Sequence, residues 1–149
     1  MNTEQFWKLI ALINTTALDD GYEDAAVAPL QEALRKYKPE KLEAFEEQLS
    51  VALHAIDGRL YALNAGDSGD SDDGFLYARC YVVAKGLAYY VSVLANPKLM
   101  PNSIDQWCEA LLYPHRKAWA EVTGKDESEW IFDASVSYES GSNESLWKE

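Results

Sequence analysis

The sequence predicts an all-α protein: a compact bundle of five or six helices around a central hydrophobic helix, with a C-terminal extended or β-like arm. Apolar residues recur at intervals of three and four through most of the 149 residues, which is the period of a helix. The segment 75–96 is apolar on nearly every side and carries only two charges, so we expect other helices to cover it. In residues 130–138 apolar and more polar positions alternate, which is the period of an extended strand.

The first half of the chain predicts three helices. Thr3 can cap a first helix that reaches residue 17. A second helix follows the turn at 19–22, and Pro29 should lie in or near its first turn, because proline disrupts a helix interior. Pro39 suits the first position of a third helix, which Gly58 loosens near its middle. This third helix extends to Gly66, and its hydrated face carries Glu43, Glu46 and Glu47.

The later helices are separated by clear stop signals. Asn96-Pro97 ends the apolar helix. Ser103 with Gln106 forms a capping-box pattern ahead of a helix over 104–113. Pro114 breaks or kinks that helix, which then continues to the C-terminal glycine Gly124.

The alternating segment has no predicted sheet to join. We expect it either to lie over the helices as an extended arm or to pair with another chain, with a loose tail after it. The predicted organisation is a helical domain over residues 1–128 and an arm and tail over residues 129–149.

Composition narrows the classes of partner. Hydrophobic residues make up 48% of the chain, which is too apolar for a disordered protein even at a net charge of −12. This negative charge argues against nucleic acid and against an anionic membrane surface, both of which attract clustered Lys and Arg. It favours a basic protein partner or simple solubility. The sequence carries no signal for an oligomeric state.

A cytoplasmic location is expected. The N-terminus lacks the basic start and continuous apolar region of a signal peptide, and no apolar run approaches the roughly 20 residues that span a bilayer. Cys80 and Cys108 are isolated thiols within helical patterns, as in proteins of a reducing compartment. We expect both to be small core residues rather than nucleophiles.

The acidic stretch at 66–74 raises the question of a metal site. A helix-loop-helix calcium loop needs glycine at its sixth position and glutamate at its twelfth. Counting from Asp67 gives Asp72 and Ala78, and counting from Asp70 gives Phe75 and Tyr81, so both registers fail. An irregular weak calcium or magnesium site is the alternative. We favour a helix cap, in which Ser71, Asp72 and Asp73 accept from the free N–H groups of the next helix.

Arg79 lies about one and a half turns into the apolar helix, where a charge needs a partner. Our interpretation is an ion pair with a carboxylate from the preceding loop or a neighbouring helix. The alternative is an arginine that binds an anionic ligand.

No known catalytic or cofactor motif is present, and we predict neither a metal nor a cofactor. Neither His54 nor His115 has ligands at a recognisable zinc spacing, although Asp57 shares a helix face with His54. There is no glycine-rich phosphate loop and no nucleophile elbow.

The chain resembles a catalogued bacterial family. FWKLI at 6–10, SDDGFLYAR at 71–79 with YVVAKG at 81–86, and LLYPHRKAWAEVTG at 111–124 are similar to motifs of the domain of unknown function 4240 family. The resemblance implies a small helical fold and brings no established activity. It marks as signature or candidate binding residues Phe6, Trp7, Asp72, Asp73, Phe75, Tyr77 and Arg79.

The leading functional hypothesis is a non-catalytic acidic protein-binding domain. Its sharpest version is an immunity protein that neutralises a cognate, basic bacterial toxin. Aromatic side chains would anchor the partner and acidic ones would speed encounter, and the candidate partner surface comprises Asp67, Asp70, Trp130 and Phe132. One alternative is an enzyme or ligand sensor with a pocket formed by Asp72, Asp73, Tyr77 and Arg79. The other is a mimic of nucleic acid.

Overall fold

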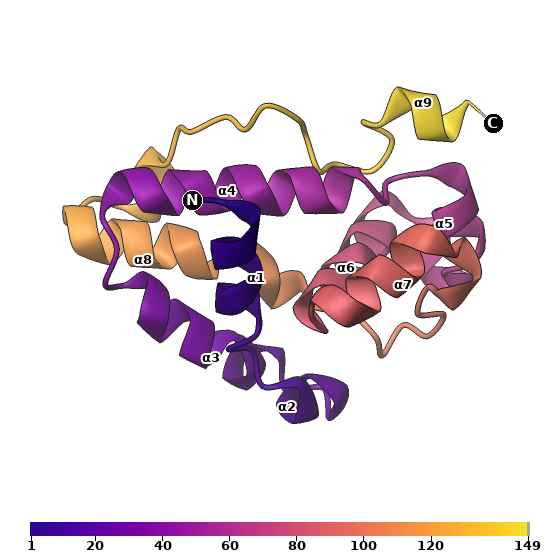
Figure 1. Cartoon of the computed structure of the whole chain (residues 1–149), viewed down its shortest axis with the longest axis horizontal. Helices are drawn as coiled ribbons and strands as arrows, with labels where there is room; N and C mark the ends of the chain where they lie inside the picture. The colour runs from indigo at the N-terminus through magenta and orange to yellow at the C-terminus, as the bar shows by residue number, and fades with distance from the viewer. Residues whose placement is uncertain (149) are drawn as a thin grey trace.

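In the computed structural model, which describes residues 1–148, the chain folds into α-helices with no β-strand among them (Figure 1). Six of the helices in this range are eight or more residues long, which confirms the predicted all-α bundle. The α-helices are α1 (Thr3–Ile10), α2 (Thr15–Asp19), α3 (Glu23–Leu34), α4 (Pro39–His54), α5 (Arg59–Leu63), α6 (Asp72–Ala84), α7 (Leu87–Ala95), α8 (Pro114–Thr123) and α9 (Glu144–Trp147). The 3₁₀ segments are η1 (Gly66–Asp70), η2 (Pro97–Leu99), η3 (Glu109–Leu112) and η4 (Glu127–Glu129).

The long helix α4 forms one side of the molecule and packs against α1, α6 and α8 (Figure 1). Helix α3 lies against α8 on the opposite side from the arm. None of the helices in residues 1–148 combines the length and apolarity needed to cross a bilayer.

Helix α6 is the predicted central helix. Ten of its thirteen residues are buried, and their neighbours come from α4, α7, η1 and η3. The expected helix over 75–96 is nevertheless two helices, α6 and α7, because the chain turns at Gly86. Gly86 has a φ of 105°, a left-handed conformation that glycine adopts without steric cost.

Several other helix boundaries differ from the predicted ones. Asn2, rather than Thr3, caps α1 by accepting from the backbone N–H of Gln5. The first predicted helix is interrupted after Ile10, and the third ends at His54 and restarts as α5 after Gly58. Pro39 opens α4 as predicted.

Two predictions about local breaks were wrong. Pro29 lies inside α3, where its exposed position lets water solvate the carbonyl that loses an N–H partner. The Gln106 side chain accepts from the Ser103 N–H, but the Ser103 hydroxyl accepts from the Asp105 N–H rather than that of Gln106, and these bonds close a turn with no α-helix following at 104–113. Pro114 is therefore the first residue of α8 and does not kink a longer helix. Gly124 ends α8 in the left-handed conformation, as predicted.

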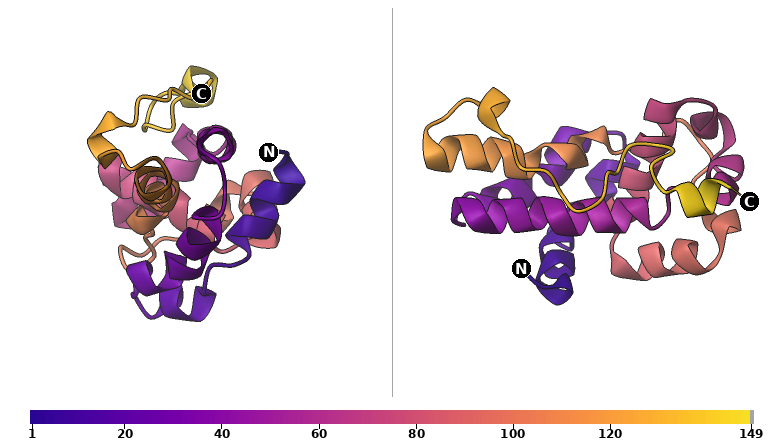
Figure 2. Two further views of the ribbon diagram at one scale, coloured as in Figure 1. Left: turned by 90° about the vertical axis from the view of Figure 1, so that its left-hand side faces the viewer. Right: turned by 90° about the horizontal axis from the view of Figure 1, so that it is seen from above.

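The arm leaves the end of α8, crosses back along α4 and ends in α9 beside α5 (Figures 1 and 2). Its backbone over 130–138 is extended, and alternate side chains from Phe132 to Tyr138 are half-buried while those between them are exposed. The predicted arm over the helices is confirmed. The expected loose tail is wrong, because residues 140–147 are hydrogen-bonded to the helical domain.

Candidate functional site

In the acidic stretch at 66–74, residues 66–70 form η1, and Ser71 caps α6 as predicted, whereas the carboxylates of Asp72 and Asp73 do not accept a capping hydrogen bond from any described residue. Ser71 accepts from the backbone N–H of Gly74 at 3.0 Å, and Asp72 and Asp73 lie exposed in the first turn of α6. Their charge there complements the positive end of the helix dipole. Asp67 and Asp70 are exposed on η1. Within residues 1–148 no group of three or more His, Cys, Asp or Glu side chains is arranged to hold a metal ion.

Arg79 is fully buried and is bonded on two sides. Its Nη1 donates to the Leu53 carbonyl at 3.0 Å, and its Nη2 donates to Ser140 Oγ at 3.0 Å. The guanidinium carbon lies 4.6 Å from the centre of the Phe75 ring. Burial lowers the pKa of Arg79, and the nearby charge of Asp57 partly offsets this effect. The predicted ion pair was wrong: within residues 1–148 Arg79 is hydrogen-bonded to uncharged oxygens, and the nearby Asp57, between α4 and α5, acts on it only through space.

Asp57, between α4 and α5, is fully buried beneath the tail. Its carboxylate accepts from the backbone N–H groups of Gly141 and Asn143, each at 3.0 Å. It also accepts from the indole N–H of Trp147 at 2.8 Å. One buried carboxylate therefore binds three donors of the tail, and ionised acceptors form the stronger hydrogen bonds.

The ends of the tail segment are also fixed. Ser140 Oγ donates to the Asp72 carbonyl at 2.7 Å, and the Asn143 side chain donates to the His54 carbonyl at 2.8 Å. The Trp147 ring packs edge-on against Phe75 at 5.9 Å. We call the surface formed by Asp57, Gly58, Phe75 and Arg79 and the carbonyls of residues 53, 54 and 72 the tail groove.

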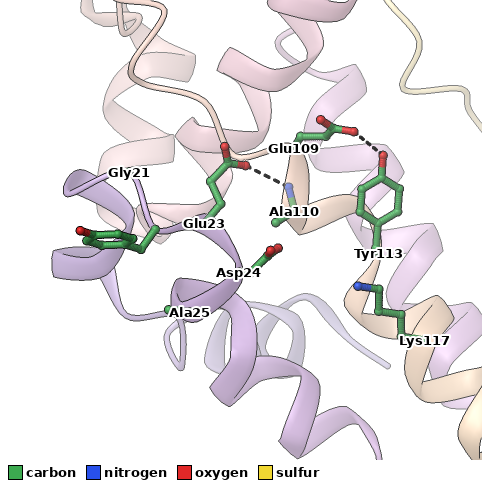
Figure 3. Close-up of a pocket in the computed structure, with 9 residues that line it drawn as sticks. Gly21, Glu23, Asp24, Ala25, Glu109, Ala110, Tyr113 and Lys117 are labelled. Atoms are coloured by element: carbon green, nitrogen blue, oxygen red, sulfur yellow. Dashed lines mark hydrogen bonds between the residues drawn. The ribbon is translucent and has the colours of Figure 1, made fainter.

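A second site is an open hollow of about 730 Å³ between the start of α3 and the η3–α8 segment (Figure 3). Glu23 accepts from the Ala110 backbone N–H at 3.1 Å, which joins its two walls. Tyr113 donates to Glu109 at 2.6 Å, and this bond is the main cause of the raised pKa of Tyr113. We call it the acidic hollow; its lining residues are Gly21, Tyr22, Glu23, Asp24, Ala25, Glu109, Ala110, Tyr113 and Lys117.

Tyr77 of α6 lies outside the acidic hollow and packs against Trp107. Its ring packs edge-on against Trp107 at 5.5 Å, and Trp107 donates to Ser68 of η1 at 2.8 Å. Burial raises the pKa of Tyr77, and the charges of Glu109 and Asp73 raise it further. Tyr77 therefore lies near Trp107 and Glu109.

Sequence reasoning missed a third site, the buried cluster of Glu46, His115 and Arg116. His115 Nε2 donates to Glu46 at 2.5 Å, and Arg116 Nη2 donates to the other Glu46 oxygen at 2.8 Å. Arg116 also donates to the Tyr138 hydroxyl of the arm at 3.2 Å. The Trp130 ring lies 5.6 Å from His115, edge-on, and 5.6 Å from the Arg116 guanidinium.

The electrostatics of this cluster favour a neutral imidazole. Complete burial lowers the pKa of His115, although Glu46 partly opposes the shift. Burial alone would raise the pKa of Glu46, but the hydrogen bond from His115 and the charge of Arg116 hold it below its usual value. A neutral His115 leaves one buried carboxylate facing one guanidinium. An open cavity of about 430 Å³ beside this pair is lined by arm residues between Phe132 and Glu139.

The remaining signature residues belong to the packing of α1. Phe6 is buried against Phe45 at 5.2 Å between ring centres. Trp7 is half-buried against Tyr90 at 4.9 Å and lines a shallow apolar hollow with Ala11 and Leu87.

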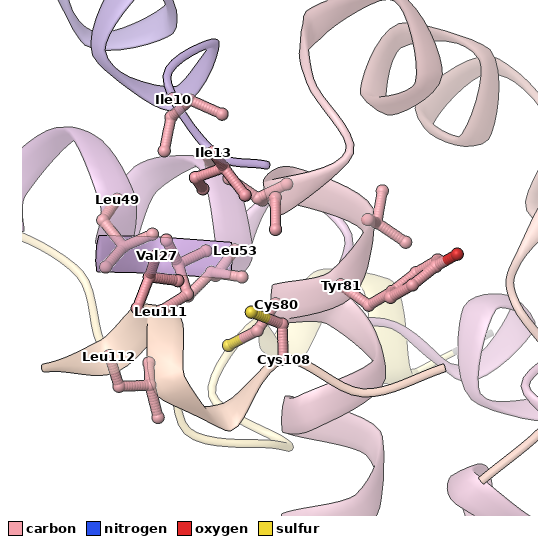
Figure 4. Close-up of a cluster of buried hydrophobic side chains, with 14 of the residues drawn as sticks. Ile10, Ile13, Val27, Leu49, Leu53, Cys80, Tyr81, Cys108, Leu111 and Leu112 are labelled. Atoms are coloured by element: carbon pink, nitrogen blue, oxygen red, sulfur yellow. The ribbon is translucent and has the colours of Figure 1, made fainter. Parts of the chain in front are cut away.

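Both cysteines lie in the core, as predicted. Cys80 and Cys108 are buried free thiols whose sulfur atoms lie close together (Figure 4). Burial raises the pKa of Cys80 and raises that of Cys108 to about 12. Thiols held protonated in this way are poor nucleophiles.

The model of a family described as "Protein of unknown function (DUF4240)" matches residues 1–125. The chain belongs to this family. No curated protein and no solved structure matches it. The matched region contains α1 to α8, and two of its side chains, Phe75 and Arg79, contact a tail that lies outside the family match.

Proposed function

We propose that this DUF4240 protein is a non-catalytic binding domain whose acidic hollow receives a basic segment of a protein partner. The observation that carries the proposal is the convergence of three carboxylates and two tyrosines on one hollow of about 730 Å³. A basic side chain entering it would meet Glu23, Asp24 and Glu109.

The tyrosines supply the second part of the argument. Tyr22 and Tyr113 are 67% and 39% exposed, and exposed tyrosines are common among residues that dominate binding energy. Lys117 is the base that lines the hollow, so an approaching cation meets a net negative surface. The net charge of −12 would steer such a partner toward the protein.

The sharper form of the proposal is an immunity protein. Acidic small proteins can neutralise a basic toxin by covering the positive surface that the toxin uses. In this form of the proposal the partner binds the acidic hollow, rather than the candidate surface formed by Asp67, Asp70, Trp130 and Phe132. Trp130 packs against His115, Trp119 and Phe132, and Asp67 and Asp70 lie on η1 and could contribute long-range attraction.

The alternative of a pocket enzyme or ligand sensor is less well supported. It needs Asp72, Asp73, Tyr77 and Arg79 around one pocket, but Arg79 is buried and bonded to Leu53 and Ser140. Asp72 and Asp73 are exposed, and Tyr77 faces Trp107 and Glu109.

The test is cross-linked affinity capture from the native host with a matched pair of variants. The hollow variant combines Tyr22→Ser and Asp24→Asn; serine at the N-cap of α3 favours the helix, so a loss of binding does not come from unfolding. The control combines Tyr37→Ser and Glu40→Gln, which change an exposed tyrosine and an exposed acid outside the hollow.

We expect the wild type and the control to retain one partner that the hollow variant loses. With the purified partner, the hollow variant should bind at least tenfold more weakly, and added salt should weaken wild-type binding. The immunity version further requires that the partner alone slows growth and that co-expression restores it. Equal binding by all three proteins would refute the proposal, and displacement of the partner by duplex DNA would favour the nucleic-acid mimic instead.

A further inference from the structure

The arm and the domain beneath it differ in burial. In the described part of the chain, no residue after Trp119 is fully buried. The tail groove under the arm, in contrast, contains the fully buried Asp57 and Arg79. The domain therefore supplies the enclosed polar groups, and the tail lies on them as a half-buried segment.

The tail contacts the groove through both its backbone and its side chains. Two of the three donors to Asp57 are backbone N–H groups, from Gly141 and Asn143. Backbone donors two residues apart are available in any extended or turning peptide, whereas the Trp147 indole adds selectivity. The Ser140 hydroxyl bridges Arg79 and the Asp72 carbonyl, which suits a small hydroxyl side chain at that place.

Gly58 lets the tail approach closely. A Cβ atom at Gly58 would lie 2.8 Å from the Leu146 Cβ, well inside contact distance. The backbone of Gly58 is extended, with a φ of −155°, so a side chain there would not strain its own residue. The absence of a side chain at Gly58 is therefore needed for the close approach of the tail, and not for the backbone conformation of Gly58 itself.

We infer that the tail groove is a peptide-binding site that the chain's own residues 139–148 occupy in cis. Its ligands are short peptides with a small hydroxyl residue, two backbone N–H groups for Asp57, and a tryptophan for the Phe75 edge. The tail is then an internal competitor that closes the DUF4240 signature site until a peptide of the same chemistry replaces it. This inference is independent of the acidic hollow.

The tether explains why the tail occupies the groove in the intact chain. A short tether gives the attached segment an effective concentration on the order of millimolar, so a free peptide at micromolar concentration competes poorly. Cutting the tether removes this advantage and leaves the groove unchanged. Peptide binding to the cut chain therefore measures the affinity of the groove without competition from a covalently attached tail.

The experiment inserts a protease recognition sequence beside Ile131, whose side chain is 89% exposed, into the full chain. The folded protein is cut and dialysed, and a fluorescent peptide of residues 132–148 is added to cut and uncut protein. We expect anisotropy to show binding to the cut protein that is at least a hundredfold tighter than to the uncut one. The same peptide with Trp147→Ala should bind at least tenfold more weakly.

Gly58→Ala provides the matched control within the groove. The cut G58A protein should keep its helical circular dichroism signal and should not bind the peptide. Loss of the helical signal on cutting the wild type would overturn the inference, because the tail would then be part of the fold. Equal peptide binding by cut and uncut protein, or a released segment that never exchanges, would overturn it as well.

Discussion

Two buried charge clusters hold the arm, and they differ in what they contribute. The Glu46–His115–Arg116 cluster reaches the arm through one hydrogen bond from Arg116 to Tyr138 and through the stacked Trp130. Asp57 with Arg79 reaches it through four hydrogen bonds, two of them from the arm's backbone. The first cluster mainly joins α4 to α8, whereas the second is mainly directed at the tail.

This difference indicates how each cluster should respond to change. The Glu46 cluster contains an imidazole, so its stability depends on pH. The Asp57 cluster contains no imidazole, and we expect it to respond to mutation and to competing peptides. The predictions below separate the two clusters, from the largest expected effect to the smallest.

Replacing the arginine of each cluster should give the largest difference in the free energy of unfolding between the two clusters. Arg79→Met leaves Asp57 as a buried charge without its compensating cation and should reduce the free energy of unfolding by about 3–5 kcal/mol. Arg116→Met should cost roughly 1–2 kcal/mol, because the Arg116 side chain is 31% exposed and water can solvate what remains. Urea denaturation followed by circular dichroism measures both. Equal losses would contradict the distinction.

Asp57→Asn should release the tail while the domain stays folded. The substitution removes the charge that accepts from Gly141, Asn143 and Trp147, and we expect the tail's attachment to weaken by about 2 kcal/mol. Limited proteolysis should cut the variant within 132–148 well before it cuts α6. A tail that resists the protease as well as in the wild type would show that the carboxylate does not hold it.

Acidification should act on the other cluster. The pKa of His115 is lowered by burial, so the unfolded chain takes up a proton near pH 6.5 that the folded chain does not, and stability should fall as pH drops below about 6.5. The lowered pKa of Glu46 extends the fall below about pH 4.5. Thermal unfolding across pH 4–8 measures this.

The control for the pH dependence is His115→Gln. Its melting temperature should vary less between pH 5 and pH 7 than that of the wild type, because the titrating group is absent. An unchanged slope in this window would assign the dependence to other groups.

The smallest effect concerns the cap beside the tail groove. Ser71→Ala removes the acceptor of the Gly74 N–H and should destabilise α6 by about 1 kcal/mol. The loss should appear near Ser140, which donates to the Asp72 carbonyl, and not at Tyr138. Amide chemical shifts of the two segments distinguish these outcomes, and a larger change at Tyr138 would contradict the proposed arrangement.

Local structure could be predicted from the sequence where residues that are neighbours in the chain determine it. The Ser71 cap, Pro39 at the start of α4, Gly124 at the end of α8 and the extended arm all depend on neighbouring residues. Ser103 and Gln106 show the limit, because the Gln106 side chain accepts from the Ser103 N–H and the Ser103 hydroxyl accepts from the Asp105 N–H, and yet no α-helix follows. A cap pattern fixes a local turn, and tertiary packing decides whether a helix continues.

The buried clusters could not be predicted because their members are far apart in the chain. Glu46 and His115 are separated by 69 residues, and Asp57 and Gly141 by 84. The burial of Glu46 could have been predicted from its spacing, because it lies four residues after Leu42 and three before Leu49, on the buried stripe of α4. The prediction that it shares the hydrated face with Glu43 and Glu47 was wrong.

Amide hydrogen exchange in the intact chain tests most directly whether the tail is a bound segment of a domain that is complete without it. The account predicts that the Gly141 and Asn143 amides exchange at least a hundredfold faster than those in the middle of α6, through openings that leave the helices folded. Asp57→Asn should accelerate the first group and leave the second unchanged. Exchange of both groups at one rate, through unfolding of the whole chain, would contradict it.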